Sequence, residues 1–156
     1  MCSSDLDKEN GQINPKALNA IRLFPSGITS WGARTMVGAD DTGNVDDKYI
    51  NVRRMMLFIE NSLYRGLRFA TFKNNAEPLW ASIRLAAGSF MNGLMVQGAF
   101  ASKTKSDAYY VLCDSTTTTA NDINLGIVNV LVGFAPNKPA EFVHLTVTQI
   151  AGQIEA

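Results

Sequence analysis

The most regular pattern of apolar positions runs over residues 47–72, where large apolar side chains recur at steps of three and four residues. This spacing is that of one face of an α-helix. A second helical pattern follows, which Asn75 can cap, with Pro78 in its first turn and Gly98 at its end. We expect the two helices to pack against each other along their apolar positions, which are Val52, Met56, Ile59, Leu63 and Leu67 in the first and Leu79, Ile83, Ala87, Phe90 and Leu94 in the second.

The remaining ordered stretches are typical of strands. Runs rich in β-branched and aromatic residues predict short strands at residues 20–24, 28–37, 107–113 and 127–134. Residues 141–150 alternate strictly, with Val143, Leu145 and Val147 on one face and His144, Thr146 and Thr148 on the other. This last strand is suited either to its own hairpin mate or to another subunit. The patterns together predict an α+β fold, with two main helices packed on one face of a small mixed β-sheet.

The size and composition of the chain describe one domain. Its 156 residues are enough for one hydrophobic core, and 46% apolar with 18% charged residues is the composition of a globular protein. We expect residues 1–13 to be a disordered or truncated lead-in, residues 14–150 to form the domain, and residues 141–156 to form a terminal strand or arm. Fourteen basic and fourteen acidic residues cancel, so no overall field draws the chain to nucleic acid or to a membrane.

The polar face of the first helix is basic. Glu60 is the only acid between residues 48 and 73, against six basic side chains, several with apolar neighbours. One interpretation is an ordinary solvated helix face. The other is a docking surface for an acidic partner, because Arg with interleaved apolar side chains is typical of interface cores.

No pattern in the chain indicates covalent chemistry. Phosphate-binding glycine loops, C-x-x-C and H-E-x-x-H do not occur, and one histidine, His144, cannot build the usual zinc sites. The acids of residues 38–46 lack the calcium-loop spacing, so we expect a solvated turn there. Cys113 has no motif that supplies a base, and we expect a small buried apolar side chain. We therefore expect neither an enzyme nor a cofactor or metal.

Several segments, in order along the chain, resemble a known family. They include W-G-A-R-T at residues 31–35, K-Y-I-N-V-R-R at residues 48–54, and the stretch from Gly126 to Pro136 that leads into K-P-A-E-F at residues 138–142. With Asn14-Pro15 and Asn19 to Arg22, this set resembles the C-terminal domain of contractile tail sheath proteins, which occur in tailed bacteriophages and related contractile particles. The resemblance covers about residues 14–150. The family's outer domains and N-terminal arm have no counterpart in this chain, which favours a fragment as one interpretation.

The resemblance implies a structural subunit that polymerises around a tail tube, in stacked six-fold rings, and contracts with energy stored in the assembly. Its implied partners are other sheath subunits, the tail tube protein and the baseplate, with no direct contact to nucleic acid or membrane. The implied location is the virion tail, assembled in the host cytoplasm. The family also implies that strands from neighbouring subunits complete the sheet.

Two sets of residues follow as candidates. The intersubunit strand would comprise Glu141, Phe142, Val143, Leu145, Val147 and Gln149. The surface facing the tube would comprise Lys48, Arg53, Arg54, Leu57, Arg65 and Arg68, with a sheath–sheath contact as the alternative. Two other functions stay open: a baseplate or tail-terminator component with a sheath-like fold, and a small ligand-binding module.

Overall fold

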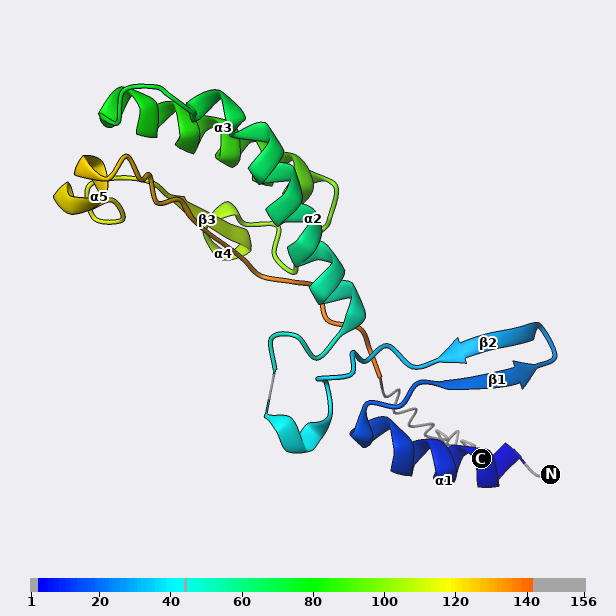
Figure 1. The fold of residues 1–156 in the computed structure, drawn as a ribbon. Coiled ribbons are helices and arrows are strands. Elements are labelled where there is room, and N and C mark those ends of the chain that lie inside the picture. Colours follow the sequence, from blue (N-terminus) through cyan, green and yellow to red (C-terminus); the bar gives the residue numbers. More distant parts are fainter. Residues whose placement is uncertain (1–2, 44, 142–156) are drawn as a thin grey trace, which may run out of the picture.

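The computed structural model describes residues 3–43 and 45–141. Helices and two β-hairpins alternate along these residues (Figure 1). The first half of the chain contains α1 (Ser3–Ile13), the 3₁₀ turn η1 (Asn14–Lys16), β1 (Ala20–Phe24), β2 (Gly27–Trp31), η2 (Asp40–Thr42), α2 (Ile50–Gly66) and η3 (Arg68–Ala70). The second half contains α3 (Glu77–Val96), α4 (Lys105–Ala108), β3 (Tyr109–Leu112), α5 (Ala120–Asn124) and β4 (Leu131–Phe134).

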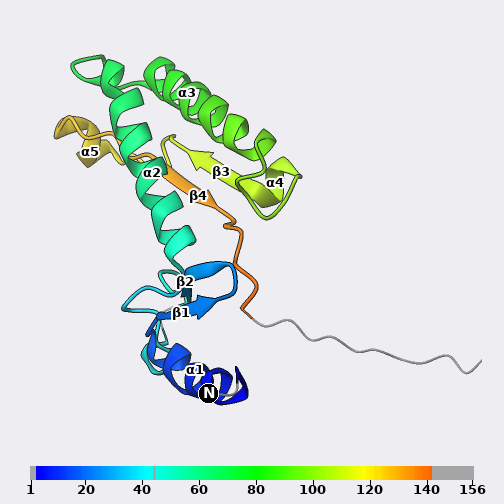
Figure 2. The same cartoon turned by 90° about the vertical axis from the view of Figure 1, so that its right-hand side faces the viewer.

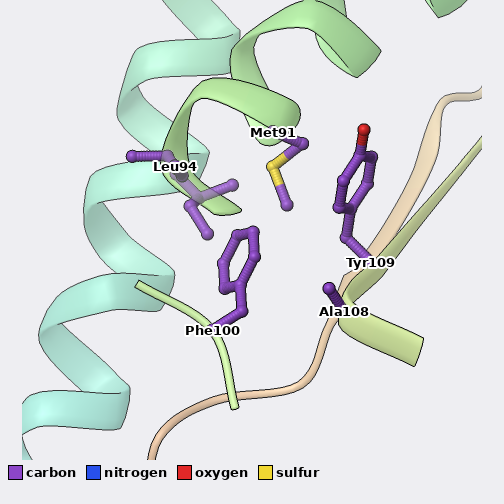
Figure 3. Close-up of a cluster of buried hydrophobic side chains, with 6 residues drawn as sticks. Met91, Leu94, Phe100, Ala108 and Tyr109 are labelled. Atoms are coloured by element: carbon purple, nitrogen blue, oxygen red, sulfur yellow. The ribbon is translucent and has the colours of Figure 1, made fainter. Parts of the chain in front are cut away.

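The hydrophobic core lies between the long helices α2 and α3 and one face of the β3–β4 hairpin (Figures 1 and 2). In this antiparallel pair Tyr109 is opposite Phe134 and Val111 is opposite Val132, so these four side chains share a face. They pack against Met91 and other buried residues of the helices and of the α3–α4 connection (Figure 3). The apolar faces of the helices and of the hairpin thus pack together in this cluster, and a second buried cluster of Leu79, Trp80, Ile83 and Cys113 adjoins the first half of α3.

The opposite face of the β3–β4 hairpin carries Tyr110, Leu112 and Leu131, which are 41–51% exposed. The Tyr110 ring lies against Gly133, and a Cβ at position 133 would collide with it. A side chain at position 133 would therefore require the partly exposed Tyr110 ring to move. Ring and backbone together cover part of a face that the chain's own helices do not reach.

The β1–β2 hairpin stands apart from this core, at the end of the molecule where α2 begins (Figure 1). One of its faces carries Ile21, Leu23 and Ile28, each 77–80% exposed. On the other face the Arg22 guanidinium lies 5.2 Å from the centre of the Phe24 ring and 5.6 Å from that of Trp31. This hairpin is held by aromatic and cation–π contacts instead of a core of its own.

The structure confirms the α+β class and the two expected helices, but it corrects several details. Among the described residues the strands form two separate two-stranded antiparallel sheets, not one mixed sheet. Residues 3–13 form helix α1, where we expected a disordered or truncated lead-in. Asn75 does not cap α3, whose N-cap is Ala76; the Asn75 Oδ1 instead accepts a hydrogen bond from the Trp80 indole.

The strand expected at residues 127–134 is ordered as a strand only from Leu131. Side chains bind the backbone of its first half: Asn75 donates to the Ile127 carbonyl, the Asn129 N–H donates to Thr118 Oγ1, and Thr117 Oγ1 donates to the Asn129 carbonyl. Because the backbone groups of Ile127 and Asn129 bind these side chains, residues 127–130 lie outside the hydrogen-bonded ladder of β3 and β4.

A substitution at Met91 tests the assignment of the core, because the Met91 side chain is fully buried among Ile59, Leu94 and Tyr109. We expect Met91→Ala to lower the free energy of unfolding by about 2–5 kcal/mol. Leu85 lies on the same helix and is 75% exposed, so Leu85→Ala should change it by less than about 0.5 kcal/mol. Urea denaturation followed by circular dichroism measures both. Equal effects would contradict the proposed core.

Candidate functional site: the α2–β4 groove and the Arg34 cluster

A groove of about 950 Å³ runs between α2 and β4. We call it the α2–β4 groove. Its α2 wall includes the apolar stripe expected from the sequence, and its other wall includes residues 130–134. Four charged residues also line it, which are Asp46, Glu60, Arg68 and Lys138. Ile59 is buried at the base of the groove, whereas Met56 is 45% exposed. The helix stripe is therefore only partly covered by the chain's own sheet, and the walls are Val52, Met56, Ile59, Leu63 and Leu67 on one side and Val130, Leu131, Val132, Gly133 and Phe134 on the other.

The groove borders the open edge of β4. The described strands pair β4 only with β3. The Ala135 N–H donates to the Ala108 carbonyl, on the β3 side. Since successive residues of an antiparallel strand direct their backbone groups to opposite edges, those of Gly133 face β3 and those of Val132 and Phe134 face the open edge. The groove thus combines an apolar floor with backbone donors and acceptors that a further strand can pair with.

Beyond β4 the chain runs past Pro136 and Lys138, which still line the groove, and ends its described course at Glu141, near the start of α2 (Figure 1). Glu141 there meets Arg34 in a two-pronged ion pair: Arg34 Nε lies 2.7 Å from Glu141 Oε1, and Arg34 Nη2 lies 2.9 Å from Oε2. Arg34 is 3% exposed, and the Glu141 side chain is 12% exposed. Such fork-to-fork pairs fix orientation as well as distance.

Two further charges complete what we call the Arg34 cluster. Arg34 Nη1 lies 2.9 Å from Asp40 Oδ1, and Lys48 Nζ lies 2.8 Å from the same oxygen. Hydrogen bonding to Arg34 lowers the pKa of Glu141 below its ordinary value, against the effect of burial. Hydrogen bonds from Lys48 and then Arg34 likewise lower the pKa of Asp40. Both carboxylates therefore stay charged at neutral pH, so the cluster of Arg34, Asp40, Lys48 and Glu141 is ionic.

The residues predicted to face a tube do not form one uniform surface. Lys48 belongs to the Arg34 cluster, and Arg53 Nη1 lies 3.4 Å from Asp47 Oδ1. Arg68 lines the α2–β4 groove and stacks at 5.8 Å on the Tyr64 ring. The exposed outward face of α2 retains Arg54, Leu57 and Arg65.

The predicted intersubunit strand falls mostly outside the described residues. Only Glu141 of that set is described; Phe142, Val143, Leu145, Val147 and Gln149 are not, nor is His144. Cys113 is fully buried, as expected, and burial raises the pKa of its thiol. The described residues contain no group of three His, Cys, Asp or Glu side chains that could hold a metal ion. None of the helices in these residues has the length and apolar character of a membrane span.

Sequence reasoning missed the groove and the role of Arg34. The helical stripe was assigned wholly to the core, although Met56 within it is exposed. Arg34 was part of the W-G-A-R-T motif, but nothing in its neighbours indicates a carboxylate 107 positions away. The one available signal was Glu141 in the K-P-A-E-F segment, an acid at the root of the predicted strand.

Comparison with known proteins gave matches among solved structures. No family model matches the chain, and no curated protein matches it. The baseplate structure of the anti-feeding prophage (AFP) contains a chain 33% identical, with a TM-score of 0.83 over 93% of this chain. The sheath of an extracellular contractile injection system (PVC), in its contracted state, matches at 36% identity and a TM-score of 0.81 over 92%. The contracted AFP helical sheath matches at 33% identity and 0.78 over 91%.

These matches confirm the resemblance: over more than nine tenths of its length the chain is similar to part of sheath and baseplate proteins of contractile injection systems, as a domain of the sheath family would be. Its structural neighbours are sheath and baseplate proteins of contractile injection systems, and these matches support a structural role in such particles. The chain spans about two fifths of the matched chains' length, 40% for the first two and 39% for the third.

Proposed function

We propose that this chain is part of a structural subunit of a contractile tail sheath, which polymerises around a tail tube and links its neighbours by exchange of strands. It carries out no covalent chemistry, and contraction draws on energy stored in the assembly. Its partners are other sheath subunits, the tube protein and the baseplate. Because the matched particles are injection systems, we infer a phage-like contractile particle, assembled in the host cytoplasm, as its location.

The observation that carries the proposal is the α2–β4 groove beside an open strand edge, in a domain similar to sheath proteins over nearly its full length. A two-stranded sheet is marginal by itself and gains stability when further strands pair with it. Residues 141–150 have the alternation that such a strand needs, with Val143, Leu145 and Val147 suited to the apolar floor.

The donor of that strand is a second copy. After β4 the described chain runs along its own groove, where Pro136 and Lys138 line it, and the Arg34–Glu141 pair holds Glu141 at the N-terminal end of α2 (Figure 1). A return into its own groove would require the chain to reverse after Glu141. Insertion into a neighbour needs no reversal and gives a connected lattice.

The outward face of α2 is the surface that we assign to the tube. Arg54 and Arg65 are both exposed there, with Leu57 between them. Exposed charge pairs are worth roughly 0–1 kcal/mol each, so many of them, summed over a ring, would hold an extended sheath and still release together. Lys48 and Arg53, which have acidic partners in their own chain, contribute less to this surface.

A baseplate component is the second candidate function, because the AFP baseplate is among the matched structures. Electron microscopy of particles assembled from the natural gene product separates the two. We expect long striated cylinders, or shorter and wider contracted ones. Closed single rings of fixed height would instead favour a baseplate or tail-terminator component, and monomers with a bound small molecule would contradict both.

Strand insertion makes a prediction about the groove. A fluorescent peptide of residues 142–156 should bind saturably to the chain truncated after Glu141, measured by fluorescence anisotropy. Met56→Glu should weaken this binding at least about tenfold, because it puts a charge into the apolar wall of the groove.

Leu57→Glu is the matched control. Leu57 adjoins Met56, is 40% exposed and is absent from the groove walls. It should leave peptide binding unchanged, and a peptide of scrambled sequence should not bind. Equal losses for both variants, or binding of the scrambled peptide, would argue against insertion into this groove.

The outward basic face makes a separate prediction. Arg54→Glu combined with Arg65→Glu should reduce co-sedimentation with the tube protein at low salt and leave the circular dichroism spectrum unchanged, because screening and charge reversal act on exposed pairs. Lys16→Glu with Lys103→Glu makes the same change of charge at exposed positions outside α2. Equal tube binding by both double variants would refute this assignment.

A further inference from the structure

The Arg34–Glu141 pair joins two segments that lie 107 positions apart, and it is the last described contact before residue 142. Within the described residues it is the one point where the root of the C-terminal arm is held by a buried, two-pronged ion pair. An ordinary surface ion pair would not restrain a chain in this way, since exposed pairs exchange with water. Here Arg34 is 3% exposed and the Glu141 side chain is 12% exposed, so water has little access to the pair.

Arg34 is itself held in place by its backbone. The Asn19 side chain accepts a hydrogen bond from the Arg34 N–H at 3.1 Å and donates one to its carbonyl at 2.8 Å. Arg34 also forms a β-bridge to Tyr49, and the N–H of Ile50, the first residue of α2, donates to the Ala33 carbonyl at 2.9 Å. Gly32 lies so close to Asn19 that a Cβ there would collide with it. Arg34 is therefore fixed to the N-terminal end of α2.

The guanidinium has a fixed allocation of donors. Nε and Nη2 serve Glu141, while Nη1 serves Asp40 at 2.9 Å and the Gly38 carbonyl at 3.4 Å. Asp40, which is shared with Lys48, binds Nη1 alone, so Nε and Nη2 remain for Glu141. Glu141 thus meets a receptor whose position is set by the backbone contacts of Arg34 with Asn19 and Tyr49.

We propose that Arg34 is the anchor of the C-terminal arm: by holding Glu141 it fixes the point and the direction in which residues 142–156 leave the domain toward a second copy. The proposal rests on the function proposed above, in which that arm enters a neighbour's α2–β4 groove. Arg34 acts here as a positioning residue, because its role is exerted through Glu141.

The physical advantage is one of effective concentration. An arm that starts from a fixed point samples a smaller volume than one that starts from a free tether. In addition, the backbone entropy of residues 135–141 is lost on folding of the domain and not again on assembly. Release of Glu141 would leave the groove intact and make delivery of the arm inefficient.

Two variants separate anchoring from a general role in stability. Glu141→Ala removes the carboxylate on the arm. Asp40→Ala removes the other carboxylate bound by Arg34 and leaves the arm held. A third variant, Glu141→Gln, retains the shape of the side chain and one acceptor oxygen. Its label mobility and its oligomeric fraction should therefore fall between those of Glu141→Ala and of the unaltered chain.

The direct readout is motion at the root of the arm. Ala140 is exposed and adjoins Glu141, so a nitroxide on Ala140→Cys, in a Cys2→Ser background, reports it by electron paramagnetic resonance; Cys113 is fully buried. In dilute monomer we expect Glu141→Ala to sharpen the spectrum to that of a mobile label, and Asp40→Ala to leave it close to that of the unaltered chain. Thermal unfolding of each variant verifies that the domain is folded.

The second readout is assembly, measured as the oligomeric fraction in sedimentation velocity at one chain concentration. Glu141→Ala should lower this fraction by about tenfold and leave binding of the 142–156 peptide to the groove unchanged. A label equally mobile in the Glu141→Ala and Asp40→Ala variants, or assembly that survives release of the label, would overturn the anchor and leave the sheath function standing. Failure of the 142–156 peptide to bind the unaltered groove would instead contradict the proposed function.

Discussion

Packing of one face of the β3–β4 hairpin against α2 and α3 is the interaction on which the rest of this structure depends. A two-stranded hairpin is at best marginally stable in water. Here Tyr109, Val111, Val132 and Phe134 bury one face against Ile59, Met91 and Leu94. Full burial of a large apolar side chain is worth about 1.5–3 kcal/mol, so these contacts can hold the hairpin to the helices.

That core is closed on one side and open on another. α3 packs over β3, whereas β4 meets α2 across a groove of about 950 Å³. Met56 and Leu131 stay about half exposed at its rim. Monomeric proteins protect open strand edges with charges, bulges or covering segments. A domain that instead sets an open edge beside an apolar floor is suited to be completed by another chain, as a subunit of a lattice must be.

The ionic cluster around Arg34 has a different task from the core. It holds together the W-G-A-R-T segment, the turn that contains Asp40 and the end of the described chain at the start of α2. A buried ion pair adds little net stability, because desolvation offsets most of the Coulomb attraction. Its distinctive property is orientation. The same α2 helix thus borders the α2–β4 groove and begins next to the cluster that holds Glu141.

The amino-acid sequence by itself determined the two long helices and the α+β class. Helical spacing in residues 52–67 and 79–94 specifies the faces of α2 and α3, because burial of an apolar stripe depends only on period, and the W-G-A-R-T and Y-I-N-V-R-R segments indicated the sheath family. Only the tertiary structure decided that residues 127–130 lie outside the ladder, since the Asn75, Thr117 and Thr118 side chains that bind this backbone are distant in sequence. It also decided that the α2 stripe lines a groove as well as a core, and that Arg34 meets Glu141. Such pairings depend on which segments the fold brings together, and local periodicity carries no information about contacts across 107 residues.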